Sequence, residues 1–532
     1  MENKYFSYIT EIKYWKKIIL LVIIIAVCYY ISLRFIFPGH FDPLIPQNYD
    51  YFWTYNGVSS LPWAKVFTCP RPIGFFMLKI VGILGMSGAI IFLILFNFLN
   101  ILLTIIFVKK ISNIKIYWPI ILIYLFLIFS QPGFYFNYTY DFFDTIAYFF
   151  VIATMLIWLG IGEKLTPILL AFLSILIGLS FFSKETYVVT LLIFWAYQFT
   201  FKKNKIRRNA AIMFLITSSI FITVLIHGRL SQSIWIDFAS SADSPYFTNF
   251  NPFSIWETFC FYMGGWGNAG AISIIALSLL IVVFNKKYLK EFLLLLFMGI
   301  AAYVPYSILP NHKYGFYFWL GIPLSYGVIM LAHPDMINTF LIKVKNKKTA
   351  AIFNAVFIIV FIVLAVFSLK KNMNQKKGIF WAPSMEMEQV NKNVMSSFPI
   401  LKNNIEDNDK ILITGMDVAR HPFSCQHDLV DVYFNRKNDF IENYFGNNHD
   451  WTIFKHTQNL DKSCGSISYT NDSNLDLTSY DKIFIFENDE KLMKIVSKDE
   501  VMSRKDSKIG NVSYYEAILN PELFNNNSRV SN

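Results

Sequence analysis

Residues 87–108, SGAIIFLILFNFLNILLTIIFV, decide the fold class of this chain. An uncharged helix of this length matches the roughly 30 Å hydrocarbon core of a bilayer. The whole chain of 532 residues is similar in character, with 55% hydrophobic, 18% aromatic and 16% charged residues. So few charges could not cover a soluble surface, since about 25% is usual. The composition therefore predicts a multi-pass α-helical membrane protein and excludes disordered, collagen-like and disulfide-scaffold classes.

The other apolar runs give the expected number of spans. Runs of about 17–25 residues can cross a bilayer as helices. We expect about eleven transmembrane helices, at 18–37, 87–108, 116–131, 142–160, 166–182, 187–201, 209–227, 268–284, 291–309, 315–332 and 349–369. The first run is too long for a signal peptide and lacks a small-residue cleavage site, so we expect it to be an anchor.

Charge is divided unevenly along the chain. Residues 1–369 hold 27 Lys and Arg against 13 Asp and Glu, whereas residues 370–532 hold 20 against 23. Of the 27 basic residues, 20 fall on one side of the expected membrane. Basic residues mark cytoplasmic loops, so we expect a cytoplasmic amino terminus. An odd number of spans then places the carboxy-terminal part outside the membrane, and nothing in the charge pattern indicates nucleic-acid binding.

The chain is expected to form two domains, a membrane domain of residues 1–370 and an extracytoplasmic domain of residues 371–532. The second part contains two apolar runs flanked by turn residues, Ile411–Thr414 and Ile483–Phe486, which predict buried strands. A helix-like stretch near 427–445 lies between them, which indicates a small α/β domain. Its cysteines, Cys425 and Cys464, could form a disulfide in an oxidising space or remain two free thiols.

No nucleotide-binding or metal-binding motif stands at useful spacing. His421, His427 and Asp431 fit no specific metal site, and surface histidines are commoner than ligands. Any chemistry must therefore come from scattered polar residues on the external side.

The first external loop, residues 38–86, contains two candidate carboxylates. Asp50 lies among aromatic residues in Asn48–Trp53, where partial burial would raise its pKa and suit it to act as a general base. Asp42 precedes a proline, and a solvated loop carboxylate is the favoured interpretation there. Trp53 and the other loop tryptophans fit an interfacial aromatic belt, with sugar stacking as a use for one or two.

Further ionisable residues are expected at the external ends of later spans. Asp141 and Asp144 share a helix face at the start of the fourth span. A helix N-terminus stabilises acids, which explains Asp141 better than the deeper Asp144. Lys184 and Glu185 occupy a short turn, where they could pair with each other, or Lys184 could bind an anion such as phosphate.

Three more cations invite the same interpretation. Arg71, His312 and Lys313 lie in separate external turns near acids. Each could instead extend its charged group to the water, with its stem in the membrane. Together they favour an anion site more than they do singly.

These residues, in this order, resemble the polytopic type C glycosyltransferases (GT-C), which use sugars carried on polyprenyl phosphate. The pattern is an external acid (Asp50), an Arg-Pro pair (Arg71-Pro72) leading into a juxtamembrane helix at Ile73 to Leu84, and a second acid (Asp141 or Asp144). A Lys-Glu turn (Lys184-Glu185) and a basic-Tyr turn (His312-Lys313-Tyr314, then Pro323) follow. The resemblance covers residues 15–335. The first loop lacks the paired acids of several members, and His-Lys replaces the commoner Arg.

The resemblance implies a mechanism without a nucleotide. Asp50, or Asp42 in its place, would take a proton from the acceptor hydroxyl, which attacks the anomeric carbon. Lys184, Lys313 and Arg71 would stabilise the departing lipid phosphate, with His312 beside them. Asp144 would orient the acceptor or a cation, and Glu185, Tyr314 and Trp53 would support the site. Some members use a divalent metal ion, which nothing here demands. Asp50, Asp144, Lys184 and Lys313 must then face one external cavity.

Within the superfamily, the chain most resembles bacterial membrane enzymes that add a hexose such as glucose to lipopolysaccharide O-antigen. This implies a polyprenyl-phosphate sugar donor, a cell-surface glycan or lipid-linked acceptor and a bacterial inner-membrane location. A protein O-mannosyltransferase or a lipid A aminosugar transferase fits the same residues. An O-antigen or capsule polymerase is a rival, although such enzymes use more external arginines. A lipid-linked sugar transporter or flippase is a different class, disfavoured because the acids cluster at one surface and no repeat is found.

Overall fold

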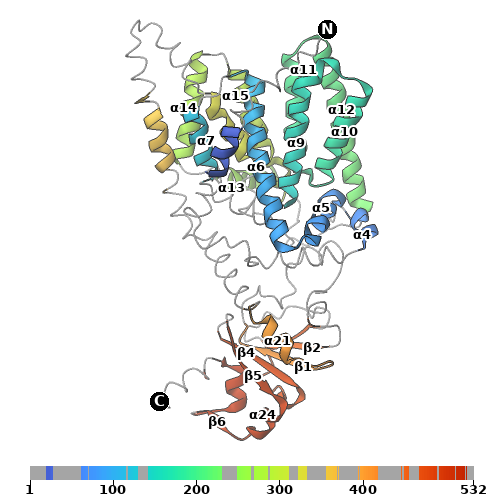
Figure 1. Ribbon diagram of the computed structural model, residues 1–532, viewed down its shortest axis with the longest axis vertical. Coiled ribbons are helices and arrows are strands. Elements are labelled where there is room, and N and C mark those ends of the chain that lie inside the picture. Colours follow the sequence, from blue (N-terminus) through green and yellow to red (C-terminus); the bar gives the residue numbers. More distant parts are fainter. Residues whose placement is uncertain are drawn as a thin grey trace. The chain divides into compact units, whose positions relative to one another are not determined.

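The computed structural model describes two compact units, a helical unit within residues 19–370 and a sheet unit within residues 394–523 (Figure 1). The described ranges are 19–27, 62–69, 71–114, 118–129, 142–230, 249–264, 269–285, 288–310, 321–331, 355–356, 358–367, 396–416, 449–454, 467–487, 491–509 and 511–521, with the single residues 370, 394, 445 and 523. The expected domain boundary at residue 370 stays a prediction, because residues 371–393 lie outside these ranges.

Among the described residues of the helical unit, four segments are long and apolar enough to cross a membrane. They are Ile91–Ser112, Phe142–Lys164, Asn204–His227 and Leu289–Ser307. The first lies in α6 (Gly85–Ser112), the second begins with α9 (Phe142–Ile161) and the third lies in α12 (Asn204–Leu230). The fourth joins α15 (Leu289–Ala301) to α16 (Val304–Ser307). The described part of this unit is therefore mainly helical, with four helices suited to a membrane crossing by their length and composition.

Shorter apolar helices occupy the other expected spans. They are α7 (Trp118–Phe129), α10 (Pro167–Phe181), α11 (Val188–Phe201), α14 (Ala269–Asn285), α17 (Ile322–Gly327) with its extension η6 (Val328–Leu331), and two helices at 19–27 and 358–367. Each of the eleven expected ranges thus overlaps a described helix, and in seven of them the described helical part has 17 residues or fewer. The number eleven therefore stays a prediction.

Local sequence signals explain where two of these helices begin and end. The side chain of Thr166 accepts a hydrogen bond from the backbone amide of Leu169, and Pro167 follows at the first position of α10. Both features are expected at a helix start. Asn113 takes the left-handed conformation at φ 53° and ends α6, because asparagine tolerates that conformation better than most residues. The short 3-10 helix η2 (Gly162–Lys164) lies between α9 and α10, which pack side by side.

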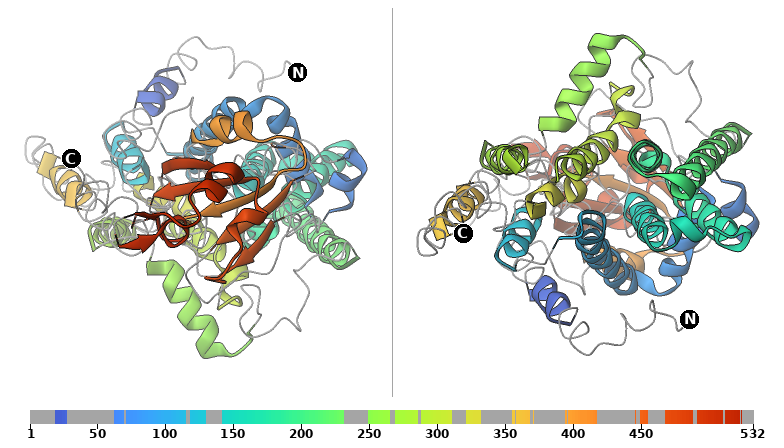
Figure 2. Two further views of the ribbon diagram at one scale, coloured as in Figure 1. Left: turned by 90° about the horizontal axis from the view of Figure 1, so that it is seen from below. Right: turned by 90° about the horizontal axis from the view of Figure 1, so that it is seen from above.

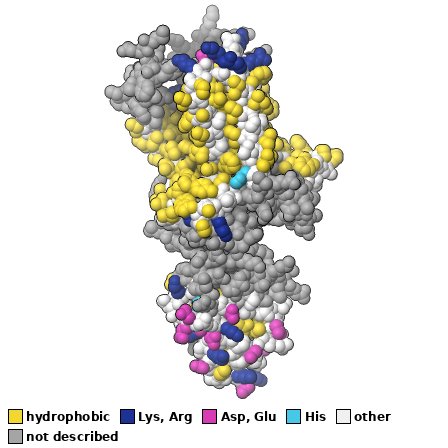
Figure 3. Space-filling view, turned by 90° about the vertical axis from the view of Figure 1, so that its right-hand side faces the viewer, with side chains coloured by type: hydrophobic (Ala, Val, Ile, Leu, Met, Phe, Trp, Pro, Cys, Tyr) yellow, Lys and Arg dark blue, Asp and Glu magenta, His cyan; other side chains and the backbone are white. Residues whose placement is uncertain are grey.

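Charge and apolar side chains are separated on the surface of the helical unit. In Figure 3 the sides of the bundle are mainly hydrophobic, and Lys and Arg side chains gather at one end. Lys203, just before α12, is exposed, and so are Lys205, Arg207 and Arg208 in its first turns. An apolar belt with a basic end is what a membrane-embedded bundle requires.

Three further helices in the described part of this unit were not among the expected spans. They are α4 (Trp63–Thr68), α5 (Pro72–Ile83) and α13 (Pro252–Gly264). The helix α5 coincides with the segment expected to follow Arg71-Pro72. Lys79 of α5 stacks over the ring of Trp63 at 4.9 Å, which fastens α4 to α5. In the view along the bundle, α13 (light green) stands out to one side (Figure 2).

The sheet unit is built on five strands in the order β3-β2-β1-β4-β5. The strands are β1 (Lys410–Thr414), β2 (Asp450–Phe454), β3 (Ile467–Thr470), β4 (Lys482–Glu487) and β5 (Lys491–Ser497). The first four are parallel and β5 is antiparallel to β4. The two strands expected from sequence are therefore confirmed as β1 and β4, whereas 427–444 of the expected helix lies outside the described residues.

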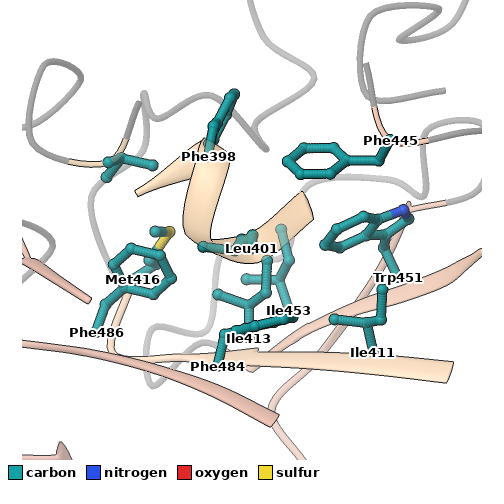
Figure 4. Packing of buried hydrophobic residues seen from close by; sticks show 11 residues of the cluster. Phe398, Leu401, Ile411, Ile413, Met416, Phe445, Trp451, Ile453, Phe484 and Phe486 are labelled. Carbon is teal, nitrogen blue, oxygen red and sulfur yellow. The ribbon is translucent and has the colours of Figure 1, made fainter. Parts of the chain in front are cut away.

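Both faces of this sheet are covered, which explains the continuous apolar runs of β1 and β4. Ile413 and Phe484 lie on the side of the sheet that faces Leu401 of α21 (Phe398–Asn404), and Ile411 lies beneath Trp451 on the same side, as Figure 4 shows. On the other face, Leu412, Ile483 and Ile485 pack against η7 (Leu477–Ser479), α24 (Lys498–Ser503) and α25 (Tyr514–Leu519). A small hairpin of β6 (Lys508–Ile509) and β7 (Val512–Ser513) precedes α25.

A polar cluster ties β5 to these helices. Lys494 Nζ lies 2.5 Å from Glu500 Oε1, and the hydroxyl of Tyr514 donates to the same oxygen at 2.9 Å. Burial raises the pKa of the Glu500 carboxyl, but the hydrogen bonds from Lys494 and Tyr514 outweigh it, so the net shift is downward. The carboxylate is therefore stabilised in its charged form.

Candidate functional site

A buried ion pair joins two of the candidate residues. Asp144 lies in the first turn of α9, and its Oδ2 accepts a hydrogen bond from Lys184 Nζ. The side chains are 0% and 4% exposed, respectively. Thr186 Oγ1 donates to the other carboxylate oxygen of Asp144 at 2.6 Å. Both carboxylate oxygens are thus engaged by side chains of the turn between α10 and α11.

The backbone of this turn sets the direction of Lys184. The amides of Ser183 and Lys184 donate to the carbonyls of Leu179 and Ser180, at 3.1 and 2.9 Å, which extends the end of α10. Lys184 then adopts an extended conformation (φ −163°, ψ 134°) before the short 3-10 helix η3 (Glu185–Tyr187). This break ends α10 and lets Lys184 and Thr186 both reach Asp144.

A second ion pair lies beside the first. Arg71 Nη2 donates to Glu185 Oε1 at 3.0 Å, with side chains 7% and 16% exposed. The guanidinium also lies 5.9 Å from the centre of the Phe143 ring. Lys184 and Glu185 are therefore paired with residues of two other segments, which decides against pairing within their own turn.

The segment after Arg71 is held close to this turn. The amide of Ile73 donates to the carbonyl of Phe182 at 3.2 Å. A Cβ at Gly74 would lie 2.2 Å from Phe143 Cδ1 and 3.1 Å from the carbonyl oxygen of Ser183. Only glycine allows this approach, so Gly74 fixes the distance between α5 and the two ion pairs.

Tyr306 of α16 completes the buried cluster. Its hydroxyl lies 3.1 Å from Thr186 Oγ1, and Lys184 Nζ lies 5.5 Å from the centre of its ring. The residues Thr186 and Tyr306 were not predicted from sequence. A hydroxyl beside Lys-Glu and a Pro-Tyr-Ser break at the end of an apolar run were the available signals.

Asp144 and Tyr306 of this cluster, together with the nearby His227, lie at ends of three candidate spans. Asp144 is at the start of Phe142–Lys164, Tyr306 is near the end of Leu289–Ser307, and His227 ends Asn204–His227. The Nε2 atom of His227 lies 2.8 Å from the carbonyl oxygen of Cys69, and its ring packs against Phe182. A carbonyl can only accept, so Nε2 donates. The charged cluster therefore lies at one end of the bundle, as expected for residues near a membrane surface.

Deeper polar contacts hold the start of α9 in place. Ser180 Oγ donates to the carbonyl of Ala147 at 3.0 Å, and Asn100 Nδ2 donates to the carbonyl of Thr145 at 2.9 Å. The hydroxyls of Thr104 and Tyr148 are 2.7 Å apart. Polar contacts between apolar helices of this kind add to packing within a bilayer.

Several predicted site residues lie outside the described residues. They are Asp42, Asp50, Trp53, Asp141, His312, Lys313 and Tyr314. The same holds for Cys425, Cys464, His421, His427 and Asp431. The structure thus brings together Arg71, Asp144, Lys184 and Glu185, and the convergence with Asp50 and Lys313 stays a prediction. Among described residues, no group of three or more His, Cys, Asp or Glu could hold a metal ion.

The arrangement is suited to holding the positively charged side chains of Lys184 and Arg71 in fixed positions. A buried charge is stable only when it is paired and hydrogen-bonded. Asp144 and Glu185 provide this for Lys184 and Arg71, and each pair is neutral. An ammonium has three N–H donors and a guanidinium five, so each of these groups can make several hydrogen bonds at once. Such preorganised donors can stabilise negative charge that develops during a reaction.

No protein-family model, curated protein or solved structure matches this chain.

Proposed function

We propose that this chain is an integral-membrane glycosyltransferase of the GT-C type. It transfers a hexose such as glucose from a polyprenyl-phosphate donor to a cell-surface glycan, such as lipopolysaccharide O-antigen, on the extracytoplasmic side. The full membrane domain would have about eleven spans in a bacterial inner membrane, with a cytoplasmic amino terminus. The sheet unit would then lie outside.

The observation that carries the proposal is the meeting of Arg71, Asp144, Lys184 and Glu185. The four come from three separate segments, and each stands at a position that the ordered sequence pattern selected. Ionisable groups buried at the ends of apolar helices are expensive and are usually retained for function. Their convergence supports a site for an anionic, lipid-linked substrate at this end of the bundle.

The reaction assigns a role to each charged residue. Asp50, or Asp42 in its place, takes the proton of the acceptor hydroxyl. That oxygen forms a bond to the anomeric carbon with inversion, and the bond to the lipid phosphate breaks. The phosphate leaves with the electron pair, and Lys184, Arg71 and Lys313 stabilise its charge. Asp144 and Glu185 orient Lys184 and Arg71 through the ion pairs.

Mass spectrometry of surface glycans tests this proposal. Cells with the gene, without it, and with Asp50→Asn or Arg71→Gln are compared, with membrane abundance measured for each variant. Glu163→Gln is the matched control, because Glu163 is exposed and lies in η2, just after the other end of α9. We expect a repeat unit heavier by one hexose in cells with the wild type or Glu163→Gln, and its loss in the deletion, Asp50→Asn and Arg71→Gln.

Other results would contradict parts of the proposal. An unchanged repeat mass with altered chain length would favour a polymerase. Loss of the added hexose in the deletion alone would move the base from Asp50 to Asp42 and remove Arg71 from the donor site. No change in any glycan would point to another acceptor or to transport.

A further inference from the structure

The helix α13 exposes large aromatic side chains on one face. Phe253 is 84% exposed and Trp256 64% exposed, and Cys260 is exposed one turn further on. Positions i, i+3 and i+7 share a helix face, so these three residues form the aromatic face of α13. Phe250, just before the helix, is also 64% exposed. Exposing an apolar patch of this kind to water is unfavourable, so it usually marks a surface that contacts something else.

The opposite face of α13 is attached to the bundle. Thr258 and Tyr262 are fully buried. The rings of Tyr262 and Tyr303 are stacked, with an interplanar angle of 2° and centres 6.1 Å apart. The amide of Asn249 also donates to the carbonyl of Ile308 at 2.9 Å. One side of the helix is therefore fixed and the aromatic face is directed away.

These attachments place α13 at the level of a membrane surface. Tyr303 lies within the candidate span Leu289–Ser307, near its end, and Ile308 directly follows that span. This is also the end of the bundle at which Asp144 lies, because Tyr306 contacts Thr186. In Figure 2 the long axis of α13 lies across the view, whereas α9 and α11 are seen nearly end-on. The helix therefore crosses the direction of the spans.

We propose that α13 is an in-plane helix whose aromatic face inserts into the boundary between lipid headgroups and acyl chains. Trp and Phe are the residues that this boundary favours. The occupant is lipid because the same unit exposes apolar side chains along a candidate span, such as Leu215 at 66% on α12, and these require a bilayer around it. The exposed acid Glu257 lies at one edge of the face. This inference does not depend on the proposed enzymatic function.

Quenching of a fluorescent label on Cys260 tests this placement. In the full chain, the other four cysteines are replaced by serine, and Cys260 keeps its native position and carries a nitrobenzoxadiazole label. The protein is reconstituted into vesicles of phosphatidylcholine and phosphatidylglycerol. Leu215→Cys on α12 serves as the lipid-facing reference and Met502→Cys on α24, which is 52% exposed, as the water-facing reference. Each reference also has Cys260→Ser, so that it carries one label.

We expect brominated lipids to quench the Cys260 label more strongly than iodide does. The label at residue 215 should behave in the same way. The label at residue 502 should instead be quenched more strongly by iodide. Iodide quenching as strong as at residue 502 would overturn the proposal. Weak quenching by both agents would overturn it too, since protein would then cover the face. In the chain with native cysteines, Trp256→Phe should lower the fraction of tryptophan emission that brominated lipid quenches, and an unchanged fraction would contradict lipid contact.

Discussion

Breaking the Asp144–Lys184 pair should destabilise the protein strongly. The side chains are 0% and 4% exposed, so water can do little to screen a charge that loses its partner. Removing one member of a buried pair costs about 3–5 kcal/mol. With 1.36 kcal/mol for each factor of ten, Lys184→Met or Asp144→Asn should lower the folded-to-unfolded ratio by about 100- to 5,000-fold.

A double-mutant cycle separates the pair from the loss of either side chain. The double variant Asp144→Asn/Lys184→Met leaves no unpaired charge, so it should be more stable than either single variant by about 2 kcal/mol. Free energies of unfolding can be measured in lipid bicelles by steric trapping. Glu163→Gln, which removes an exposed carboxylate, should change stability by no more than about 0.5 kcal/mol.

Additive losses of unfolding free energy in the two single variants would refute this reasoning. If each single variant loses less than about 1 kcal/mol and the double variant loses their sum, the two charges do not stabilise each other in a buried setting. Equal losses in the variants and in Glu163→Gln would lead to the same conclusion.

Three further predictions concern other parts of the chain. Gly74→Ala should destabilise the helical unit by about 1–3 kcal/mol, because its Cβ would overlap the ring of Phe143, whereas Gly178→Ala, with nothing within 4 Å, should be neutral or stabilising in the same unfolding assay. The pKa of Glu500 is lower in the folded state than its ordinary 4.5, so its contribution is present above that value and is lost as the pH falls through the folded pKa. Hydrogen exchange of α24 and α25, corrected for intrinsic rates, should therefore increase in acid in the wild type, and an equal increase in Glu500→Gln would refute this. Burial raises the pKa of the Cys69 thiol to about 12, so maleimide should label the exposed Cys260 and leave Cys69 unlabelled in the folded protein, as mass spectrometry of peptides would show.

Elements with a strong local signal were predicted well from sequence. The four long spans are marked by apolar runs with few charges, and β1 and β4 by apolar residues between Asp-Lys pairs and polar residues. The strand order could not be predicted, because parallel pairing joins residues such as Ile411 and Trp451 that lie far apart in the chain. The helix α13 was missed because its apolar run is short and interrupted by Glu257.

The pairing of residues within the candidate site could not be predicted from the sequence either. Asp144, Lys184, Arg71 and Glu185 were selected individually, but their pairing depends on how α5, α9 and the α10–α11 turn pack. Gly74 permits that packing, and no local pattern distinguishes it from other glycines in apolar segments. Tyr306 was missed for a similar reason, since a tyrosine in an apolar run is ordinary until a lysine is found over its ring.

The pairing of Asp144 with Lys184 also has a consequence for the synthesis of the protein. The two residues lie 40 positions apart, at the outer ends of the hairpin made by α9 and α10. A single charge costs an inserting helix free energy, most at the helix centre and less at an end such as these. The hairpin can instead enter the lipid as a neutral unit as soon as Lys184 leaves the ribosome. Arg71 is made 114 positions before Glu185, so its partner is present only once that hairpin is complete.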